Sequence, residues 1–462
     1  MSPAHLFIFG SVLVLLFALT AYRASSILAP APLWNAAWAV LFLATGALGA
    51  DFIYSTNAVM ILFLAVLTFN VGAVLVDSAP RDGERRDDTM PRRIPSWILL
   101  ACVGVGLLGA VELSRSFGTA LLELRSLGEL FSAGQQNAVL IFRGEAELTQ
   151  LQKASFALLQ AGSVLAGAKV RLERSRTAVM WCGAFLLTAM LWSSITTQRS
   201  YLLILAVWAV AGYVAAAVRQ GTFVLPPKTL LRAGASVAVL ALLVVYFRAV
   251  RVSGDGASLS GDTFASARLW VAGYIPTFSA WYDNGGSNAG EVSPGLLGGV
   301  YALFGAGTEG GDDSGGYEYI GAGLSSNAAT MMRSVFSTAG VFAAFVSMAT
   351  YGIVAQAVYR RALAGRTVAA AMYAGVVASI LWSTNAWFFN YGGRLLALAA
   401  VVTFAVAVRT LRADEAVTVR PGTRAFTVGV PVQSIAPMHH RRRPGPRKPS
   451  RAAGSSARSS AS

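Results

Sequence analysis

The sequence predicts an all-α fold, a polytopic membrane bundle of about 11 transmembrane helices with two long extracytoplasmic loops. Two observations predict it. Hydrophobic residues make up 55% of the 462 residues and charged residues only 13%, about half the share that soluble domains carry. The apolar residues also gather in stretches of about 20, the length that a helix needs to cross a bilayer. Only helices and closed barrels satisfy their backbone hydrogen bonds in lipid.

The predicted spans alternate with loops of contrasting charge. The spans are 5–22, 31–50, 57–76, 96–113, 151–169, 178–195, 201–218, 233–250, 332–357, 367–386 and 394–410. The stretch 151–169 is poor in large apolar side chains and is the weakest of them. Arginine and lysine concentrate in every second connection, and cytoplasmic loops collect basic residues. We therefore expect an outside N-terminus and a cytoplasmic C-terminus.

Two of the outer connections are long, 112–150 and 251–331. In the first, leucines recur at helical spacing, which predicts an amphipathic helix on the membrane face. The second contains the aromatic stretch LWVAGYIPTFSAWYDN, for which we expect a short interfacial helix broken at Pro276. The following residues, Gly285–Gly323, are rich in glycine, aspartate and serine and predict an irregular loop.

The chain divides into a membrane domain, 1–410, and a basic tail, 411–462. The tail has almost no large apolar side chains, which predicts disorder on the cytoplasmic side. It also carries most of the net charge of +15, so that this charge indicates a lipid surface and no nucleic-acid partner. Cys102 and Cys182 lie in apolar stretches, and the large loop contains no histidine. Neither a metal centre nor a cofactor is therefore predicted.

The residues left for chemistry are arginines on the outer side, at or near the ends of spans. They are Arg199, Arg248, Arg251, Arg268, Arg333 and Arg394. Charged side chains are costly at the membrane, and the charge bias sends arginine to the inner side. Because arginine offers a planar fork to phosphate oxygens, this group indicates a shared anion site. Snorkelling of single arginines to the outer headgroups is the alternative explanation.

Two short motifs resemble a known family. The stretch QRSYLL places Arg199 and Ser200 at a turn that enters a helix. The stretch SSNAATMMRSVFSTAG follows the large loop and contains Asn327, Thr330 and Phe336. In both, the chain resembles the bacterial O-antigen polymerases, or oligosaccharide repeat unit polymerases. It departs from their pattern at STAG, where that family commonly has an acidic residue.

The resemblance implies a metal-independent glycosyltransferase without a cofactor, in the bacterial cytoplasmic membrane. Such an enzyme transfers a growing glycan from one polyprenyl diphosphate to the sugar of another repeat unit. Arg199, Arg248 and Arg394 would then stabilise the diphosphate leaving group, and Asp283 would accept the proton of the attacking hydroxyl. The other candidates for this base are Asp51, Glu112, Glu291 and Glu318.

The resemblance also implies further substrate-binding residues and partners. The substrate-binding residues are Arg251, Arg268, Asn327, Thr330 and Arg333. The partners are a polyprenyl-diphosphate-linked oligosaccharide and the lipid bilayer, with a chain-length regulator and a flippase as further candidates.

Other functions fit parts of the sequence. An O-antigen ligase has a similar topology, but ligases usually carry a histidine in the large loop. A GT-C-type glycosyltransferase places an acidic pair in the first outer loop, where this chain has only Asp51. A transporter of lipid-linked sugars would show internal repeats and charges in the middle of the membrane, which are scarce here. A purely structural membrane protein would not need the outer arginines.

Overall fold

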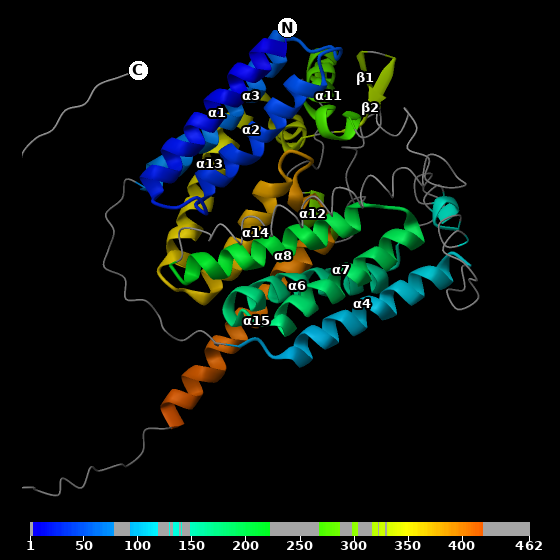
Figure 1. Cartoon of the computed structure of the whole chain (residues 1–462), viewed down its shortest axis with the longest axis vertical. Coiled ribbons are helices and arrows are strands. Elements are labelled where there is room, and N and C mark those ends of the chain that lie inside the picture. Colours follow the sequence, from blue (N-terminus) through cyan, green and yellow to red (C-terminus); the bar gives the residue numbers. More distant parts are fainter. Residues whose placement is uncertain are drawn as a thin grey trace, which may run out of the picture. The chain divides into compact units, whose positions relative to one another are not determined.

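The fold is described by a computed structural model of residues 3–77, 93–118, 129, 133–137, 140, 148–221, 268–286, 298–303, 317–321, 323–328 and 330–418. Helices occupy every predicted span except 233–250, which lies outside these residues. The long helices in Figure 1 are α1 (Pro3–Ala24), α2 (Pro30–Leu48), α3 (Thr56–Asp77), α4 (Ser96–Ser116), α6 (Gln150–Glu173), α7 (Arg176–Thr196), α8 (Ser200–Arg219), α13 (Met331–Leu363), α14 (Thr367–Trp382) and α15 (Gly392–Thr418).

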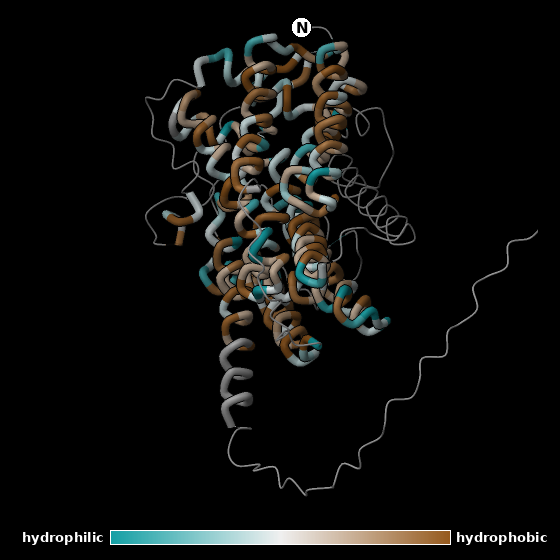
Figure 2. The backbone as a smooth tube through the Cα atoms, turned by 90° about the vertical axis from the view of Figure 1, so that its left-hand side faces the viewer, coloured by the Kyte–Doolittle hydropathy of each residue, from teal (hydrophilic) through white to brown (hydrophobic). Residues whose placement is uncertain are grey.

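Seven helices in the described part of the chain are long and apolar enough to cross a bilayer. They are α1, α2, α3, α4, α7, α8 and the part of α13 from Gly340 to Leu363. Hydrophobic residues run along them (Figure 2). α14 and the first part of α15 are shorter apolar helices, and α6 is long but carries glutamine, serine and lysine side chains. These helices support an all-α, multi-pass membrane bundle.

Hydrogen bonds and ion pairs between turns sort the helix ends into two sets. At one end, here named the site end, the turn 49–55 bonds to the segment 268–286, and Met331 N–H bonds to the Ser383 carbonyl at 2.9 Å. At the other, here named the opposite end, Arg360 Nη1 donates to the Val76 carbonyl and Arg219 Nε to the Gly365 carbonyl. This grouping agrees with the alternation of loops that the sequence predicts.

Two pairs of parallel helices cross with almost no space between their backbones. In α3 and α13, a Cβ atom built on Gly72 would lie 1.9 Å from the Ala349 carbonyl oxygen, and one on Gly352 would lie 2.1 Å from the Phe69 oxygen. α6 and α8 meet in the same reciprocal way through Gly167 and Gly212. Lipid chains are as apolar as leucine, so close backbone packing is what holds such helices together.

α13 is a broken helix. Gly340 has φ 72° and ψ −178°, a conformation open essentially to glycine alone, and it separates the first nine residues from the membrane-spanning part. The break ends the hydrogen-bond ladder of the first part. The hydroxyls of Ser337 and Thr338 both donate to the Ser334 carbonyl, at 3.2 and 2.6 Å. A short, buried half-helix, Met331–Ala339, therefore stands at the site end.

The described residues of the large loop contain more regular structure than predicted. A helical turn at 268–272 is followed by α11 (Tyr274–Trp281) and the π-turn η1 (Tyr282–Gly286). The break falls at Gly273 and not at Pro276, because a proline in the first turn of a helix replaces an N–H that has no helical partner.

The expectation of an irregular loop over Gly285–Gly323 was wrong in part. This stretch contains the short helix α12 (Gly298–Leu303) and strand β1 (Glu318–Gly321). β1 pairs with β2 (Leu324–Ser326) as an antiparallel hairpin, and the Ile53 N–H joins its edge at the Ile320 carbonyl. Backbone pairing of this kind needs no hydrophobic periodicity, which explains why composition did not reveal it.

Two predicted segments can be compared with the structure only partly. Residues 133–137 are helical, but most of the predicted amphipathic helix in 112–150 lies outside the described residues. α15 runs on to Thr418, past the predicted domain boundary at 410. By contacts within the chain, the boundary between its two units falls after Glu415, and the units are Met1–Glu415 and Ala416–Ser462.

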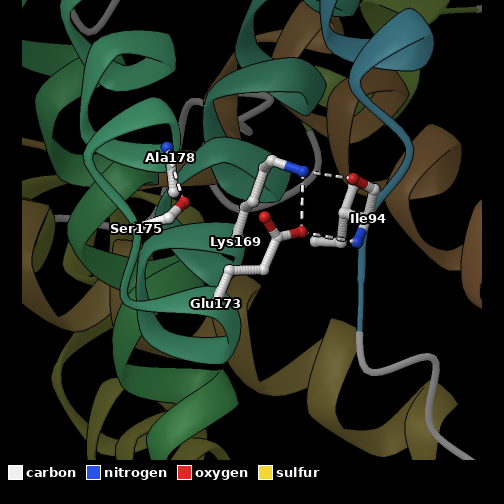
Figure 3. Close-up of polar contacts among 5 residues, drawn as sticks. All are labelled: Ile94, Lys169, Glu173, Ser175 and Ala178. Carbon is white, nitrogen blue, oxygen red and sulfur yellow. Dashed lines mark hydrogen bonds and ion pairs between the residues drawn. The ribbon is translucent and has the colours of Figure 1, made fainter.

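A buried ion pair holds the start of α4 at the opposite end (Figure 3). Lys169 and Glu173 lie one turn apart in α6, with Nζ 2.7 Å from Oε1 and side-chain exposures of 4% and 15%. Lys169 Nζ also donates to the Ile94 carbonyl, and the Ile94 N–H donates to Glu173 Oε1 at 3.2 Å. The Lys169 ammonium group thus binds the Ile94 carbonyl, and the Glu173 carboxylate binds the Ile94 N–H.

Candidate functional site

The segment 268–286 organises the site end. The Tyr274 hydroxyl donates to Asn385 Oδ1 at 3.0 Å, which ties the segment to the turn after α14. The Ser279 hydroxyl accepts from the Ser55 N–H at 2.8 Å, which ties it to the turn before α3. Every residue of α11 except Ala280 is buried, so the segment is packed into the protein and does not lie on its surface.

Burial also affects the pKa of Tyr274, a residue of this segment. Burial raises the pKa of the Tyr274 hydroxyl, and the positive charge of Arg199 acts in the opposite direction. The raised pKa keeps this hydroxyl protonated around neutral pH, so that it remains the donor to Asn385.

Two of the predicted arginines lie over tryptophan rings of this segment. The guanidinium carbon of Arg199, at the start of α8, is 4.6 Å from the centroid of Trp270. The guanidinium carbon of Arg333, in the first turn of α13, is 5.4 Å from that of Trp281. Arg333 is buried, with 4% exposure. Stacking fixes the plane of a guanidinium, and its N–H groups lie in that plane.

Arg268 has both a ring and a counter-ion. It lies 4.8 Å from the centroid of Phe52, and its Nη2 is 2.8 Å from Asp51 Oδ2. Asp51 follows α2, so the ion pair joins the segment 268–286 to the turn between α2 and α3. Its two side chains are 23% and 47% exposed, which makes it a weak, solvent-screened contact.

Arg394 is buried, like Arg333, and has the most aromatic neighbours of the predicted arginines that the structure describes. It is 5% exposed and lies over three rings, those of Tyr391 at 4.3 Å, Phe388 at 4.9 Å and Trp382 at 5.3 Å. Its Nη1 donates to the Phe388 carbonyl at 2.9 Å. The arginine therefore orders the turn between α14 and α15, in which η4 (Phe388–Asn390) lies.

Asp283 is exposed and is oriented by a serine that the sequence analysis did not identify. Ser55 caps α3, with its Oγ accepting from the Ala58 N–H at 3.1 Å, and the same hydroxyl donates to Asp283 Oδ1 at 2.9 Å. The next residue, Asn284, donates to Glu318 Oε2 at 2.9 Å. A serine directly before a predicted helix is a capping signal, so Ser55 could have been found from the sequence.

Asn327 and Thr330 differ in their surroundings. Asn327 is exposed at the end of the β hairpin. Thr330 is the N-cap of α13, is completely buried, and makes no side-chain capping bond. Its carbonyl accepts from the Arg333 N–H at 3.0 Å. Only Thr330 is therefore part of the buried architecture of the site end.

The structure gathers the predicted site residues that it describes at one end of the bundle, on 268–286 and the turns bonded to it. Arg248 and Arg251 lie outside the described residues. The sequence analysis missed the aromatic partners of the arginines. Trp270 and Trp281 were recognised only as part of an interfacial stretch, because the pairing of distant side chains leaves no local pattern.

No protein-family model, curated protein or solved structure matches the chain. The function must therefore be inferred from the chemistry of the site end and from the motif resemblance.

Proposed function

We propose that the chain is a membrane glycan polymerase, joining polyprenyl-diphosphate-linked repeat units on the outer side of a bacterial cytoplasmic membrane. The observation that supports this best is the arrangement of arginines. Four of the six predicted arginines are described, all four belong to the site end, and each lies over an aromatic ring. An arginine that snorkels to a headgroup needs no such ordering.

Ordered arginines suit a diphosphate. A ring contacts the face of the guanidinium, whereas phosphate oxygens bind its edge, so both contacts can form together. The conformational entropy of the long side chain is then lost on folding and not on binding. Arg268 is paired with Asp51, whereas Arg394 uses one of its N–H groups on the Phe388 carbonyl and has further N–H groups for a ligand.

The reaction then follows from this arrangement. A sugar hydroxyl of one lipid-linked unit attacks the anomeric carbon of another, and a new glycosidic C–O bond forms. The bond between that carbon and the diphosphate oxygen breaks, and its electron pair leaves with the lipid diphosphate. Asp283 takes the proton of the hydroxyl, and the Ser55 hydroxyl orients its carboxylate. Arginines stabilise the charge that develops on the leaving oxygen.

The test is the rate of polymer formation by arginine variants matched for membrane level. We expect Arg199→Ala and Arg394→Ala to lower the rate about tenfold to a hundredfold, since a charge-assisted contact contributes about 1.5–3 kcal/mol. Arg→Lys should rescue little, because lysine keeps the charge but loses the planar fork. Arg361→Ala, at an exposed arginine of the opposite end, is the matched control.

Near-normal polymer from the lysine variants would contradict the diphosphate site and leave the arginines as interface anchors. Transfer of one repeat unit without polymer would indicate a ligase. Movement of the lipid-linked sugar without any new glycosidic bond would indicate a transporter.

A further inference from the structure

Two buried donors at the site end have no hydrogen-bond partner among the described residues. The bond from the Met331 N–H to the Ser383 carbonyl joins the residue after Thr330 to the residue after Trp382. Thr330 Oγ1 and Trp382 Nε1 are both inaccessible, and neither makes a hydrogen bond in the described part of the chain. A buried polar group without a partner is costly, so two such groups at the site end need an explanation.

A buried positive charge lies next to Trp382. The Arg394 guanidinium is 5.3 Å from the Trp382 ring centroid, and the side chain is 5% exposed. No described carboxylate lies within 4 Å of it, although buried charges in proteins are normally paired. The three side chains supply many donors, and the acceptor bonded to them in the described part of the chain is the Phe388 carbonyl. The group is therefore rich in donors and poor in acceptors.

The N-terminus of a helix adds to this excess. Thr330 is the N-cap of α13, and the first N–H groups of a helix have no partner within it. Together they carry roughly half a positive charge. Of these groups, Met331 N–H bonds to the Ser383 carbonyl and Arg333 N–H to the Thr330 carbonyl. The positive N-terminus of α13 therefore favours a negatively charged ligand.

We propose that Thr330, Trp382 and Arg394 form a binding site for a phosphate-type oxyanion at the N-terminus of α13. This deepens the proposed function and rests on it, because the oxyanion would be one phosphate group of the lipid diphosphate. The Trp382 N–H and the Thr330 O–H are its new direct ligands, beside the arginine. Both atoms are covered in this structure, so the ligand enters only when the turn 383–391 moves away from Thr330.

Thr330→Val separates this site from a packing role, because it removes the hydroxyl and keeps the shape. Without ligand, the variant should be as stable as the parent or more stable, since an unpaired buried hydroxyl is lost. Its affinity for inorganic pyrophosphate should fall about tenfold, the loss of one hydrogen bond to a charged group. Trp382→Phe should lose affinity in the same way, and Thr330→Ser should retain it.

The measurements are calorimetric binding and thermal unfolding of the purified full chain in nanodiscs. Ser193→Ala is the matched control, since the Ser193 hydroxyl is also buried and without a partner in the described part of the chain, but lies in α7. It should leave the affinity for pyrophosphate unchanged. A short-chain isoprenyl diphosphate is the second probe. Tighter binding of it than of pyrophosphate identifies a lipid-borne ligand, whereas equal binding identifies recognition of the phosphates alone.

Unchanged affinity in both Thr330→Val and Trp382→Phe would overturn the inference. If Arg199→Ala still lost binding and polymer formation, the proposed function would survive that result. Loss of stability in Thr330→Val without ligand would also contradict the site, since it would show that the hydroxyl has a partner in the folded chain.

Discussion

At the opposite end, basic side chains bind the backbone of neighbouring turns. Lys169, Arg219 and Arg360 each donate to a carbonyl of another connection, at Ile94, Gly365 and Val76. At the site end, the arginines lie over aromatic rings instead. The carbonyl bonds of the opposite end hold neighbouring turns together, whereas a ring beside a guanidinium restrains the long side chain that carries it. Arginine therefore has different contacts at the two ends of the bundle.

The pair of Lys169 and Glu173 gives a prediction for a buried charge. Removing one partner leaves the other uncompensated, so Lys169→Met and Glu173→Gln should each lower the free energy of unfolding by about 3–5 kcal/mol. The double variant, Lys169→Met with Glu173→Gln, should be less destabilised than the sum of the two single changes. Thermal unfolding in detergent measures all three.

The matched control is Arg174→Gln, at an exposed residue directly after α6. It should change the stability by less than about 0.5 kcal/mol. Additive losses in the double variant would show that the two charges act independently, against the shared clamp on Ile94 described above.

At the scale of helices, the reciprocal glycine contacts decide which pairs can form. Gly72→Ala places a methyl group 1.9 Å from the Ala349 carbonyl oxygen, and neither backbone can move without separating α3 from α13. Overpacking of this kind costs about 1–3 kcal/mol or more. We therefore expect a large loss of folded protein, measured by fluorescence-detected chromatography of the membrane extract.

Gly104→Ala and Gly183→Ala are the controls for that substitution. Both glycines lie within helices, in α4 and α7, and a Cβ atom on either would meet nothing within 4 Å. Alanine is the better helix former, so these variants should be neutral or slightly stabilised. A similar loss from Gly104→Ala and Gly72→Ala would attribute the effect to helix geometry and not to the crossing.

The sequence predicted the helices better than the interruptions within them. Spans such as 57–76 and 201–218 could be predicted, because nearly all of their residues are hydrophobic. The break of α13 at Gly340 has no such signal, because glycine is common in membrane helices and only its φ distinguishes this one. Pro276 was predicted to break the helix. It lies in the first turn of α11, where a proline does not interrupt the helical hydrogen bonds.

The candidate site follows the same division. Its arginines could be predicted, because they stand in connections predicted to be outside, where basic residues are few. Each of them can be recognised singly in the sequence. Ser55 and the rings could not be paired with them from the sequence. Ser55 and Asp283 are separated by 228 residues, and nothing near either one indicates the other. Contacts of this kind are set by the assembly of the bundle.

At the scale of the whole molecule, the two sets of helix ends predict which positions share a side of the membrane. Asn327→Cys belongs to the site end and should react with an impermeant maleimide in intact cells. Arg361→Cys belongs to the opposite end and should react only after the cells are opened. Both positions are exposed in the structure, so access to solvent is not limiting.

Ser455→Cys extends this experiment to the tail, for which the charge bias predicts the cytoplasmic side. All variants carry Cys102→Ser and Cys182→Ser to remove background labelling. Reaction of Arg361→Cys and not of Asn327→Cys in intact cells would invert the predicted orientation. Reaction of both in intact cells would contradict the two-ended arrangement itself.

The pairing of α3 with α13 also has a consequence in time. The contact between Arg360 and Val76 spans 284 residues, and a ribosome adds about 5–20 residues per second. α3 therefore waits roughly 15–60 s in the bilayer before its glycine face can meet its partner. Every nonsense mutation between these two helices should thus leave Gly72 without the α13 backbone that covers it in the complete chain.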